Sequence, residues 1–212
     1  TLGIIGGTGS GKSTIVSLLL RLYDVTEGAV YVDGRDVRSM PEKELRAKFG
    51  IAFQNDFLVA STIRENVDYF RGLPEDNIQK ALACAQASEF VEGFSEKENR
   101  MLTQKGSNLS GGQKQRLIVS RALAGKPEIL VLDDSSSALD YATDAKLRKA
   151  LGRDYADCTK VIVAQRVSSV RHADLILVLD EGRIVGMGRH EELLASCEDY
   201  RQIYNVQMGG VS

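Results

Sequence analysis

The chain has 212 residues, a length that suits one α/β domain with a sizeable core and room for an inserted lobe. Its 27 Lys and Arg nearly balance its 29 Asp and Glu, so the net charge of −2 gives no reason to expect a nucleic-acid partner. No apolar run approaches the roughly 18 residues of a membrane span, so we expect this piece itself to be soluble.

The three cysteines are odd in number and widely spaced, which predicts reduced thiols and makes a metal site improbable. Neither His172 nor His190 belongs to a cluster of metal ligands, and we expect both at the surface. The chain starts only five residues before a glycine-rich loop, and we interpret it as part of a longer polypeptide.

The first predicted element is a short strand at 2–5 that runs into glycines, followed by a helix that begins near residue 12 or 13. The apolar side chains at helical spacing in this helix are Ile15, Leu18, Leu19 and Leu22. A strand at 30–32 then leads into an Asp-Gly turn, and another strand covers 49–53.

From residue 63 to residue 124 the pattern is helical, without a convincing strand. Pro74 suits the first turn of one of these helices. The apolar face of that helix consists of Ile78, Ala81, Leu82 and Ala85. We therefore expect a helical lobe here, inserted into an α/β core.

Three β-branched or leucine-rich runs follow at 128–132, 160–163 and 175–179, separated by helical segments. This alternation predicts a parallel sheet with helices on its faces. We expect 182–185 to pair with the strand before it and 191–206 to be helical.

Residues 6–14 read Gly-Gly-Thr-Gly-Ser-Gly-Lys-Ser-Thr and fit the GxxxxGK[ST] pattern of a phosphate-binding loop, the Walker A motif. In such a loop, successive backbone N–H groups form an anion-binding concavity at the N-terminus of a helix. Lys12 is placed to reach the β- and γ-phosphates, and Ser13 to ligate Mg²⁺. A glycine-rich turn is the alternative, but the flanking strand and helix favour phosphate binding. The residues expected to hold the phosphates are Gly7, Thr8, Gly9, Ser10, Gly11, Lys12, Ser13 and Thr14.

Two further segments carry chemistry. Residues 129–133 form a buried strand that ends in Asp133, as a Walker B segment requires, and we expect this carboxylate to hold Mg²⁺ through water. A core strand that happens to meet an acidic loop is the alternative.

Ser110 and Gln113 predict a capping box before an apolar helix, and the glycines between them leave N–H groups open to an incoming phosphate.

The phosphate loop together with Leu-Ser-Gly-Gly-Gln at 109–113 resembles the nucleotide-binding domain of an ABC transporter, over nearly the whole chain. In that family the second motif faces the nucleotide held by the opposite subunit. The resemblance thus implies that Ser110, Gly112 and Gln113 contact ATP across a dimer interface.

Other positions match the family as well. Gln54 resembles the Q-loop glutamine, which touches the metal and relays to the transmembrane partner. Asp140 ends a Ser-Ala-Leu-Asp stretch that resembles the D-loop, which crosses the dimer interface. The segment at 188–193 and the terminal helix resemble transporters of the exporter type. The family's adenine-stacking aromatic lies upstream of this chain, and Tyr23 and Tyr31 are not expected to replace it.

Two catalytic positions depart from the family. Asp134 stands where a glutamate usually orients the attacking water, and a carboxylate displaced by more than ~1 Å can lose roughly 10²-fold in rate. Gln165 stands in the place of the switch histidine and can donate a hydrogen bond to a γ-phosphate without carrying a proton or charge. With 109–113 intact, this combination resembles the degenerate half of a heterodimeric exporter.

The expected fold is thus α/β, a P-loop NTPase-like core with a mostly parallel sheet flanked by helices, plus an inserted helical lobe. The ATP-binding core is expected at 1–62 and 125–212, and the helical subdomain with the 109–113 motif at 63–124.

The resemblance implies the ATP-binding domain of an exporter, which binds ATP and Mg²⁺ and couples closure to export. Asp134, Gln165, Lys12 and Gln54 are its catalytic candidates, and Ser13, Gln54 and Asp133 its metal ligands. Its partners would be a second nucleotide-binding domain and transmembrane domains of the same polypeptide, at the cytoplasmic face of the membrane. The alternatives are a fully competent Mg-ATPase in a homodimer, an importer ATPase, and a non-transporter ABC protein.

Overall fold

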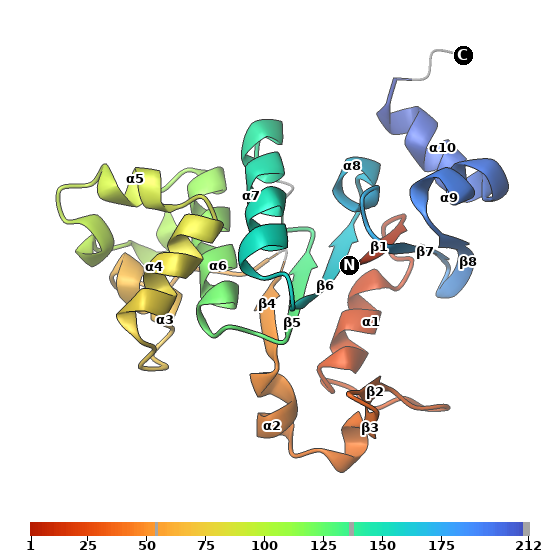
Figure 1. The fold of residues 1–212 in the computed structure, drawn as a ribbon, viewed down its shortest axis with the longest axis horizontal. Coiled ribbons are helices and arrows are strands. Elements are labelled where there is room, and N and C mark those ends of the chain that lie inside the picture. The colour runs from red at the N-terminus through yellow and green to blue at the C-terminus, as the bar shows by residue number, and fades with distance from the viewer. Residues whose placement is uncertain (54, 136–137, 210–212) are drawn as a thin grey trace. The chain divides into compact units, whose positions relative to one another are not determined.

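The computed structural model describes residues 1–53, 55–135 and 138–209. The chain divides into two compact units, Thr1–Phe49 with Thr159–Ser212 and Gly50–Cys158, which we call the first and the second unit (Figure 1). The fold class is α/β with a mostly parallel sheet, as the sequence predicts. Among the described residues, no helix combines the length and apolar character that crossing a membrane requires.

The first unit is built around a buried strand, β1 (Leu2–Gly6). It lies between β6 (Thr159–Ala164) and β7 (Leu175–Asp180) and is parallel to both. Residues 4 and 5 of β1 are fully buried, as expected for a parallel strand covered on both faces. β8 (Arg183–Gly188) pairs antiparallel with β7, which confirms the pairing predicted for 182–185.

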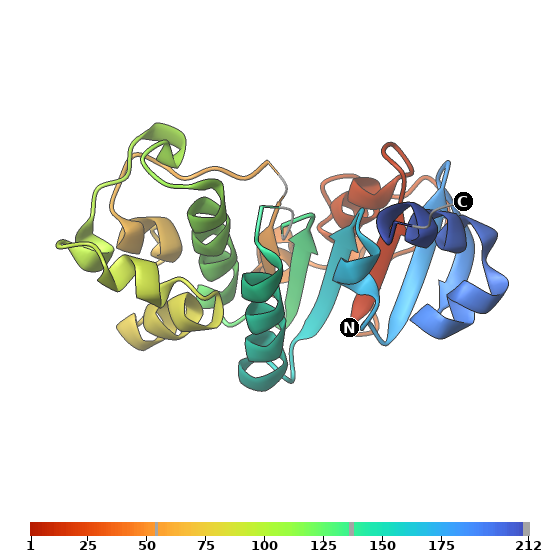
Figure 2. The same ribbon diagram turned by 90° about the horizontal axis from the view of Figure 1, so that it is seen from above.

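The helices of this unit are α1 (Lys12–Leu19), α2 (Glu42–Ala47), α8 (Val167–Val170), α9 (His190–Ser196) and α10 (Glu198–Gln207). Figure 2 shows α1 in the red part of the chain and α9 and α10 in the blue part. The single helix expected at 191–206 is wrong, because Cys197 adopts an extended backbone (φ −113°, ψ 112°) between α9 and α10. Its thiol is buried against β8, since a Cβ at Gly186 would lie 2.6 Å from Cys197 Sγ.

The expected Asp-Gly turn joins two short strands, β2 (Tyr31–Val32) and β3 (Arg35–Asp36). Asp33 and Gly34 both have positive φ, 51° and 73°, which is the geometry of a type I′ hairpin turn. A short 3-10 helix, η1 (Val37–Ser39), follows β3.

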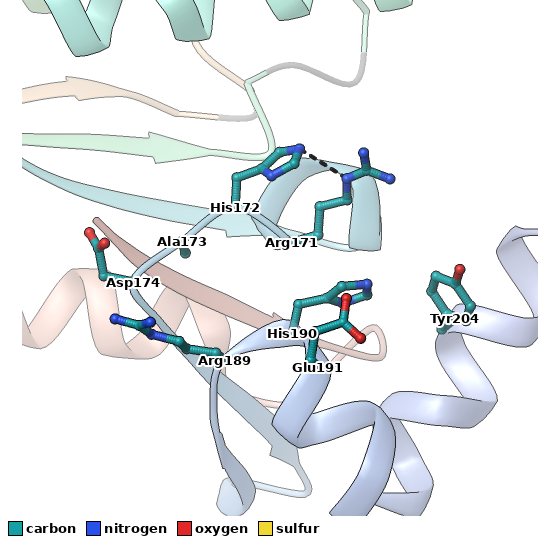
Figure 3. Close-up of a pocket in the computed structure, with 8 residues that line it drawn as sticks. All are labelled: Arg171, His172, Ala173, Asp174, Arg189, His190, Glu191 and Tyr204. Atoms are coloured by element: carbon teal, nitrogen blue, oxygen red, sulfur yellow. Dashed lines mark hydrogen bonds between the residues drawn. The ribbon is translucent and has the colours of Figure 1, made fainter.

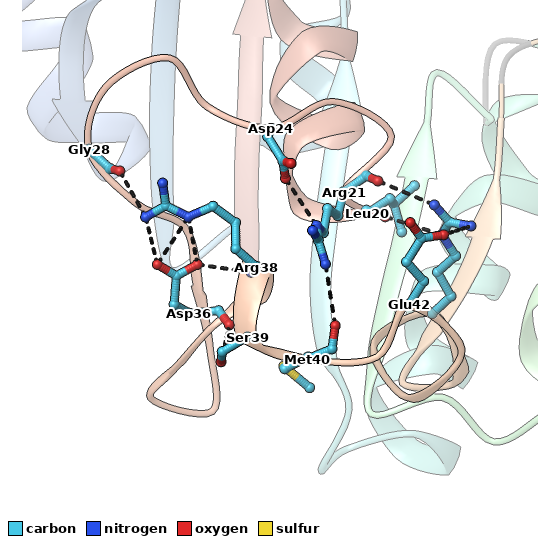
Figure 4. A network of polar contacts seen from close by, with 10 residues as sticks. Leu20, Arg21, Asp24, Gly28, Asp36, Arg38, Ser39, Met40 and Glu42 are labelled. Atoms are coloured by element: carbon cyan, nitrogen blue, oxygen red, sulfur yellow. Dashed lines mark hydrogen bonds and ion pairs between the residues drawn. The ribbon is translucent and has the colours of Figure 1, made fainter.

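Arginines fix the C-terminal end of α1 (Figure 4). Arg46 on α2 donates to the carbonyl oxygens of Leu20 (3.3 Å) and Arg21 (3.2 Å). Arg21 donates to Asp24 (3.0 Å) and to the carbonyl of Met40 (3.4 Å). Cations at this end of a helix satisfy its last carbonyls and complement its dipole, so these contacts help to set the orientation of α1.

The second unit contains two neighbouring strands, β4 (Phe49–Ala52) and β5 (Ile129–Asp133). The first residue of β4, Phe49, is still counted in the first unit. Its helices are α3 (Ile63–Asp68), α4 (Glu75–Cys84), α5 (Ser88–Glu92), α6 (Gly111–Ala124) and α7 (Tyr141–Asp154), with short 3-10 turns η2 (Lys97–Asn99) and η3 (Gln104–Gly106). Helices α3 and α4 pack on α6, whose Leu117, Val119 and Leu123 are fully buried. Across 63–124, all of it described, the structure holds helices and turns and one isolated bridge from Met101 to Thr62.

Candidate functional site

The glycine-rich loop joins β1 to α1 in the first unit. Gly9 and Gly11 have φ of 80° and 100°, values that favour glycine, and Gly11 is the N-cap of α1. On the sheet side the loop is tightly packed, because a Cβ at Gly6 would lie 2.2 Å from the carbonyl oxygen of Leu179. A Cβ at Gly7 or Gly9 would meet no atom within 4 Å, so the other side of the loop is open.

Lys12 reaches back over this loop. Its Nζ donates to the carbonyl oxygens of Gly7 (2.6 Å) and Gly6 (3.0 Å) and approaches Ser10 Oγ at 3.4 Å. Ser13 and Thr14 are exposed in the first turn of α1. An ammonium group, open glycines and the N-terminus of an eight-residue helix thus meet at one place, which fits the phosphates of a nucleotide.

Gln165 belongs to the same edge of the sheet. It follows β6, which pairs with β1 in a register that sets Ala164 opposite Ile5. Because parallel neighbours end at the same edge, the exposed Gln165 leaves the sheet beside the start of the phosphate loop. The structure therefore brings together these two parts of the predicted site.

The acidic pair follows β5 in the second unit. Asp133 is buried at 6% exposure, whereas Asp134 is half-buried. Asp134 has a φ of 48°, in the left-handed region, which aspartate enters more readily than most residues with a side chain. The backbone thus turns sharply between the two carboxylates.

The 109–113 motif starts α6, and the predicted capping box is confirmed. Ser110 Oγ accepts from the N–H of Gln113 (3.2 Å), and Gln113 Oε1 accepts from the N–H of Ser110 (2.9 Å). Gly112 lies near Ala138, before α7: a Cβ at Gly112 would stand 3.4 Å from the carbonyl oxygen of Ala138, an ordinary van der Waals distance.

Asp140 caps the N-terminus of α7. Its carboxylate accepts hydrogen bonds from the N–H (2.9 Å) and hydroxyl (2.7 Å) of Thr143. These bonds, the side-chain one first, lower the pKa of the Asp140 carboxyl below its usual value. The structure thus gives Asp140 a local capping role. Ser137 of the same stretch lies outside the described residues.

Gln54 also lies outside the described residues, whereas Asp56 and Phe57, which follow it, are described. Arg121 of α6 donates to Asp56 Oδ1 (3.2 Å) and to the carbonyl of Phe57 (3.0 Å). Its Nε donates to the carbonyl of Asn66 (2.9 Å), and its guanidinium stacks on the ring of Tyr69 at 4.5 Å. Helix α6 thereby holds the start of the segment that connects β4 to α3.

A pocket of about 570 Å³ lies elsewhere in the first unit, between the segment after α8, the start of α9, and α10 (Figure 3). His172 is exposed here, as expected. The surface position expected for His190 is wrong, because its ring is half-buried and packs against Tyr200 and Tyr204. A lone histidine has no neighbours in sequence that reveal such packing.

Two residues without a sequence signal of their own, Arg121 and Gln207, hold segments of the candidate site. In the sequence, Arg121 does not differ from the other charged residues of its helix, and Gln207 does not differ from any exposed residue near the end of a helix. Gln207 contacts the backbone on both sides of Arg166, and no local pattern indicates this pairing across 40 residues.

Comparisons with known proteins agree on one family. Residues 1–137 match the model of a family described as "ABC transporter". The chain is 43% identical over 220 residues to an uncharacterized ABC transporter ATP-binding protein of Mycobacterium tuberculosis, covering 100% of this chain and 38% of the relative. It is 38% identical over 211 residues to the ATP-binding cassette sub-family B member 6 of Xenopus tropicalis, covering 99% of this chain and 25% of the relative.

A solved structure is similar as well. A bacterial Atm1-family ABC exporter with ATP bound superposes with a TM-score of 0.93 at 34% identity, over 98% of this chain and 37% of the exporter chain. The chain therefore spans well under half the length of these relatives.

Proposed function

The chain belongs to the ABC transporter family as an ATP-binding domain of the exporter type, and from this premise we propose that it binds Mg-ATP at the interface with a second such domain and couples closure of the pair to export. The observation that carries the proposal is the position of Lys12 above an open glycine loop at the start of α1. An ammonium group and helix N–H groups there can neutralise and orient phosphate oxygens.

Each residue of the site receives a role in this proposal. The N–H groups of 7–14 bind the phosphates, and Lys12 contacts the β- and γ-phosphates. Ser13, Gln54 and Asp133 hold Mg²⁺, directly or through water. When bound there, Mg²⁺ would supply positive charge that offsets the negative charge of the phosphate oxygens. The buried Asp133 suits this role, because a nearby cation favours an ionised carboxylate.

The second unit would serve the nucleotide of the partner. Ser110, Gly112 and Gln113 present a capped helix start whose first residue, Gly111, is exposed, and a γ-phosphate could approach its N–H groups closely. Asp140 would shape the interface from the start of α7. We propose 1–62 and 125–212 as the ATP-binding core and 63–124 as the helical subdomain, with transmembrane domains and a cytoplasmic-face location in the complete protein.

We also propose that hydrolysis at this chain's own site is slow. Asp134 and Gln165 replace the usual water-orienting glutamate and switch histidine, while the phosphate-holding residues are intact. A complex with a different half-transporter would place one efficient and one slow site at the same interface. A competent homodimeric Mg-ATPase is the competing function.

The test is ATP binding by the full protein with Lys12→Ala. We expect the affinity for ATP to fall below detection, because the ammonium group that donates to the carbonyls of Gly6 and Gly7 is removed. Lys43→Ala, a matched change at an exposed residue of α2, should bind ATP like the wild type. Unchanged ATP affinity in Lys12→Ala would refute the phosphate assignment.

A further inference from the structure

The side-chain amide of Gln207, the last residue of α10, bridges the backbone just after β6. Its Nε2 donates to the carbonyl oxygen of Gln165 (2.6 Å), and its Oε1 accepts from the N–H of Val167 (2.8 Å). Only one orientation of the amide satisfies both partners, because a rotated amide would set N–H against N–H and oxygen against oxygen. Gln207 therefore makes a specific two-point contact.

This contact supplies a cap that α8 lacks locally. The N-cap residue of α8, Arg166, makes no side-chain hydrogen bond to the start of the helix. The first helical N–H, that of Val167, is satisfied by Gln207 from another helix. A local Ser, Thr, Asp or Asn cap would bond the N–H of the second or third helical residue, so Gln207 satisfies a first N–H that such a cap would not reach.

Helix α10 is firmly anchored, so its last turn can act as a support. Tyr200 is fully buried, and its hydroxyl lies 2.8 Å from His190 Nδ1. The His190 ring also packs against Tyr204, with ring centroids 5.5 Å apart. Gln207 follows Tyr200 by seven residues, or two helical turns, and thus lies on the same face of α10.

We propose that Gln207 is a positioning residue for the nucleotide switch: it fixes the main chain from Gln165 to Val167 and thereby directs the Gln165 side chain toward the γ-phosphate. The inference rests on the proposed function, in which Gln165 donates a hydrogen bond to that phosphate. Gln165 leaves the sheet beside the phosphate loop, so a shift of its backbone would move its amide relative to the loop. Such a group distinguishes ATP from ADP, because ADP lacks the γ-phosphate.

The experiment compares Gln207→Met with the wild type in the full protein. Methionine keeps the length of the side chain and loses both hydrogen bonds. We expect faster amide hydrogen exchange at Val167, an affinity for ATP lower by roughly three- to tenfold, and an unchanged affinity for ADP. Gln202→Met is the matched control on the same helix, because the Gln202 amide donates to Glu198 one turn earlier (3.4 Å) and makes no other side-chain hydrogen bond to the described residues.

Two results would overturn the inference. The first is wild-type protection of the Val167 amide in Gln207→Met, which would mean that the bridge does not form in solution. The second is an equal loss of affinity for ATP and ADP, which a general loosening of the fold would produce. If the wild-type protein bound no ATP, the proposed function would fail, and the exchange at Val167 would still decide whether Gln207 holds this segment.

Discussion

Arg121 and Asp56 form an ion pair with 3.2 Å between Arg121 Nη1 and Asp56 Oδ1, although 65 residues separate them. The Arg121 residue is 8% exposed, and burial is the first cause that lowers the pKa of its guanidinium. It stays charged, because the ordinary pKa of an arginine guanidinium lies far above neutral pH. Its hydrogen bonds to Phe57 and Asn66 compensate for much of the lost hydration.

Arg121→Met should strongly destabilise the protein. It removes the guanidinium that pairs with Asp56 and donates to the carbonyls of Phe57 and Asn66, and removing one partner of a buried pair costs about 3 kcal/mol or more. The measurement is the free energy of unfolding in urea. Arg64→Met is the matched control, because its ion pair with Glu75 is exposed and should change stability by less than about 1 kcal/mol. Similar losses in both variants would contradict the structural role of Arg121.

Ser110→Ala should separate capping from nucleotide recognition. The variant loses one half of a capping box and should lower the free energy of unfolding by about 1 kcal/mol. Thr62→Ala removes the equivalent bond at the start of α3 and should cost a similar amount. Only Ser110→Ala should also weaken ATP-dependent association of the paired domains, measured by sedimentation. Equal effects on association would show that Ser110 acts through helix stability alone.

Asp134→Glu combined with Gln165→His should raise hydrolysis at this chain's own site. The glutamate extends the carboxylate by one methylene, and the histidine can carry a proton to or from a phosphate. Glutamate fits the left-handed backbone at 134 (φ 48°) less well than aspartate, so stability should fall by roughly 1 kcal/mol. The rate of phosphate release should be measured in a complex whose other site is blocked. If phosphate release is not faster in this complex, the cause of slow hydrolysis lies outside positions 134 and 165.

Tyr200 should make stability depend on alkaline pH. Burial raises the pKa of Tyr200 to about 12 from 10. The buried, protonated Tyr200 therefore contributes fully to the free energy of unfolding below pH 10. This contribution falls by on the order of 2 kcal/mol as the pH rises from 10 toward 12. Burial raises the pKa of Tyr155 in the same direction, so part of the decline should persist without Tyr200.

The measurement for Tyr200 is the free energy of unfolding at pH 9 and pH 11.5. The difference between the two pH values should be smaller in Tyr200→Phe than in the wild type. Tyr31→Phe changes an exposed tyrosine and should leave this difference unaltered. An identical pH dependence in all three proteins would contradict the role of Tyr200.

The sequence predicted the parts of the site that depend on local spacing. The glycine-rich loop, the Ser110–Gln113 capping box and the Asp-Gly turn are each encoded within a few residues, and the structure contains each as expected. Tertiary packing determines two other contacts, that of Gln207 with Gln165 and that of Arg121 with Asp56. No periodicity or motif in the sequence predicts them. The Cys197 thiol, at the break between α9 and α10, also packs against a distant residue, Gly186 of β8.

The hydrogen bonds of Lys12 to its own loop have a thermodynamic consequence. When a phosphate binds the Lys12 ammonium, the hydrogen bonds from Nζ to the loop carbonyls are replaced by hydrogen bonds to phosphate oxygens. The number of charge-assisted contacts therefore changes little. The heat released on binding should consequently be modest, and affinity should depend on how many loop N–H groups the ligand engages at once. Small single anions such as chloride would then be poor competitors of a triphosphate.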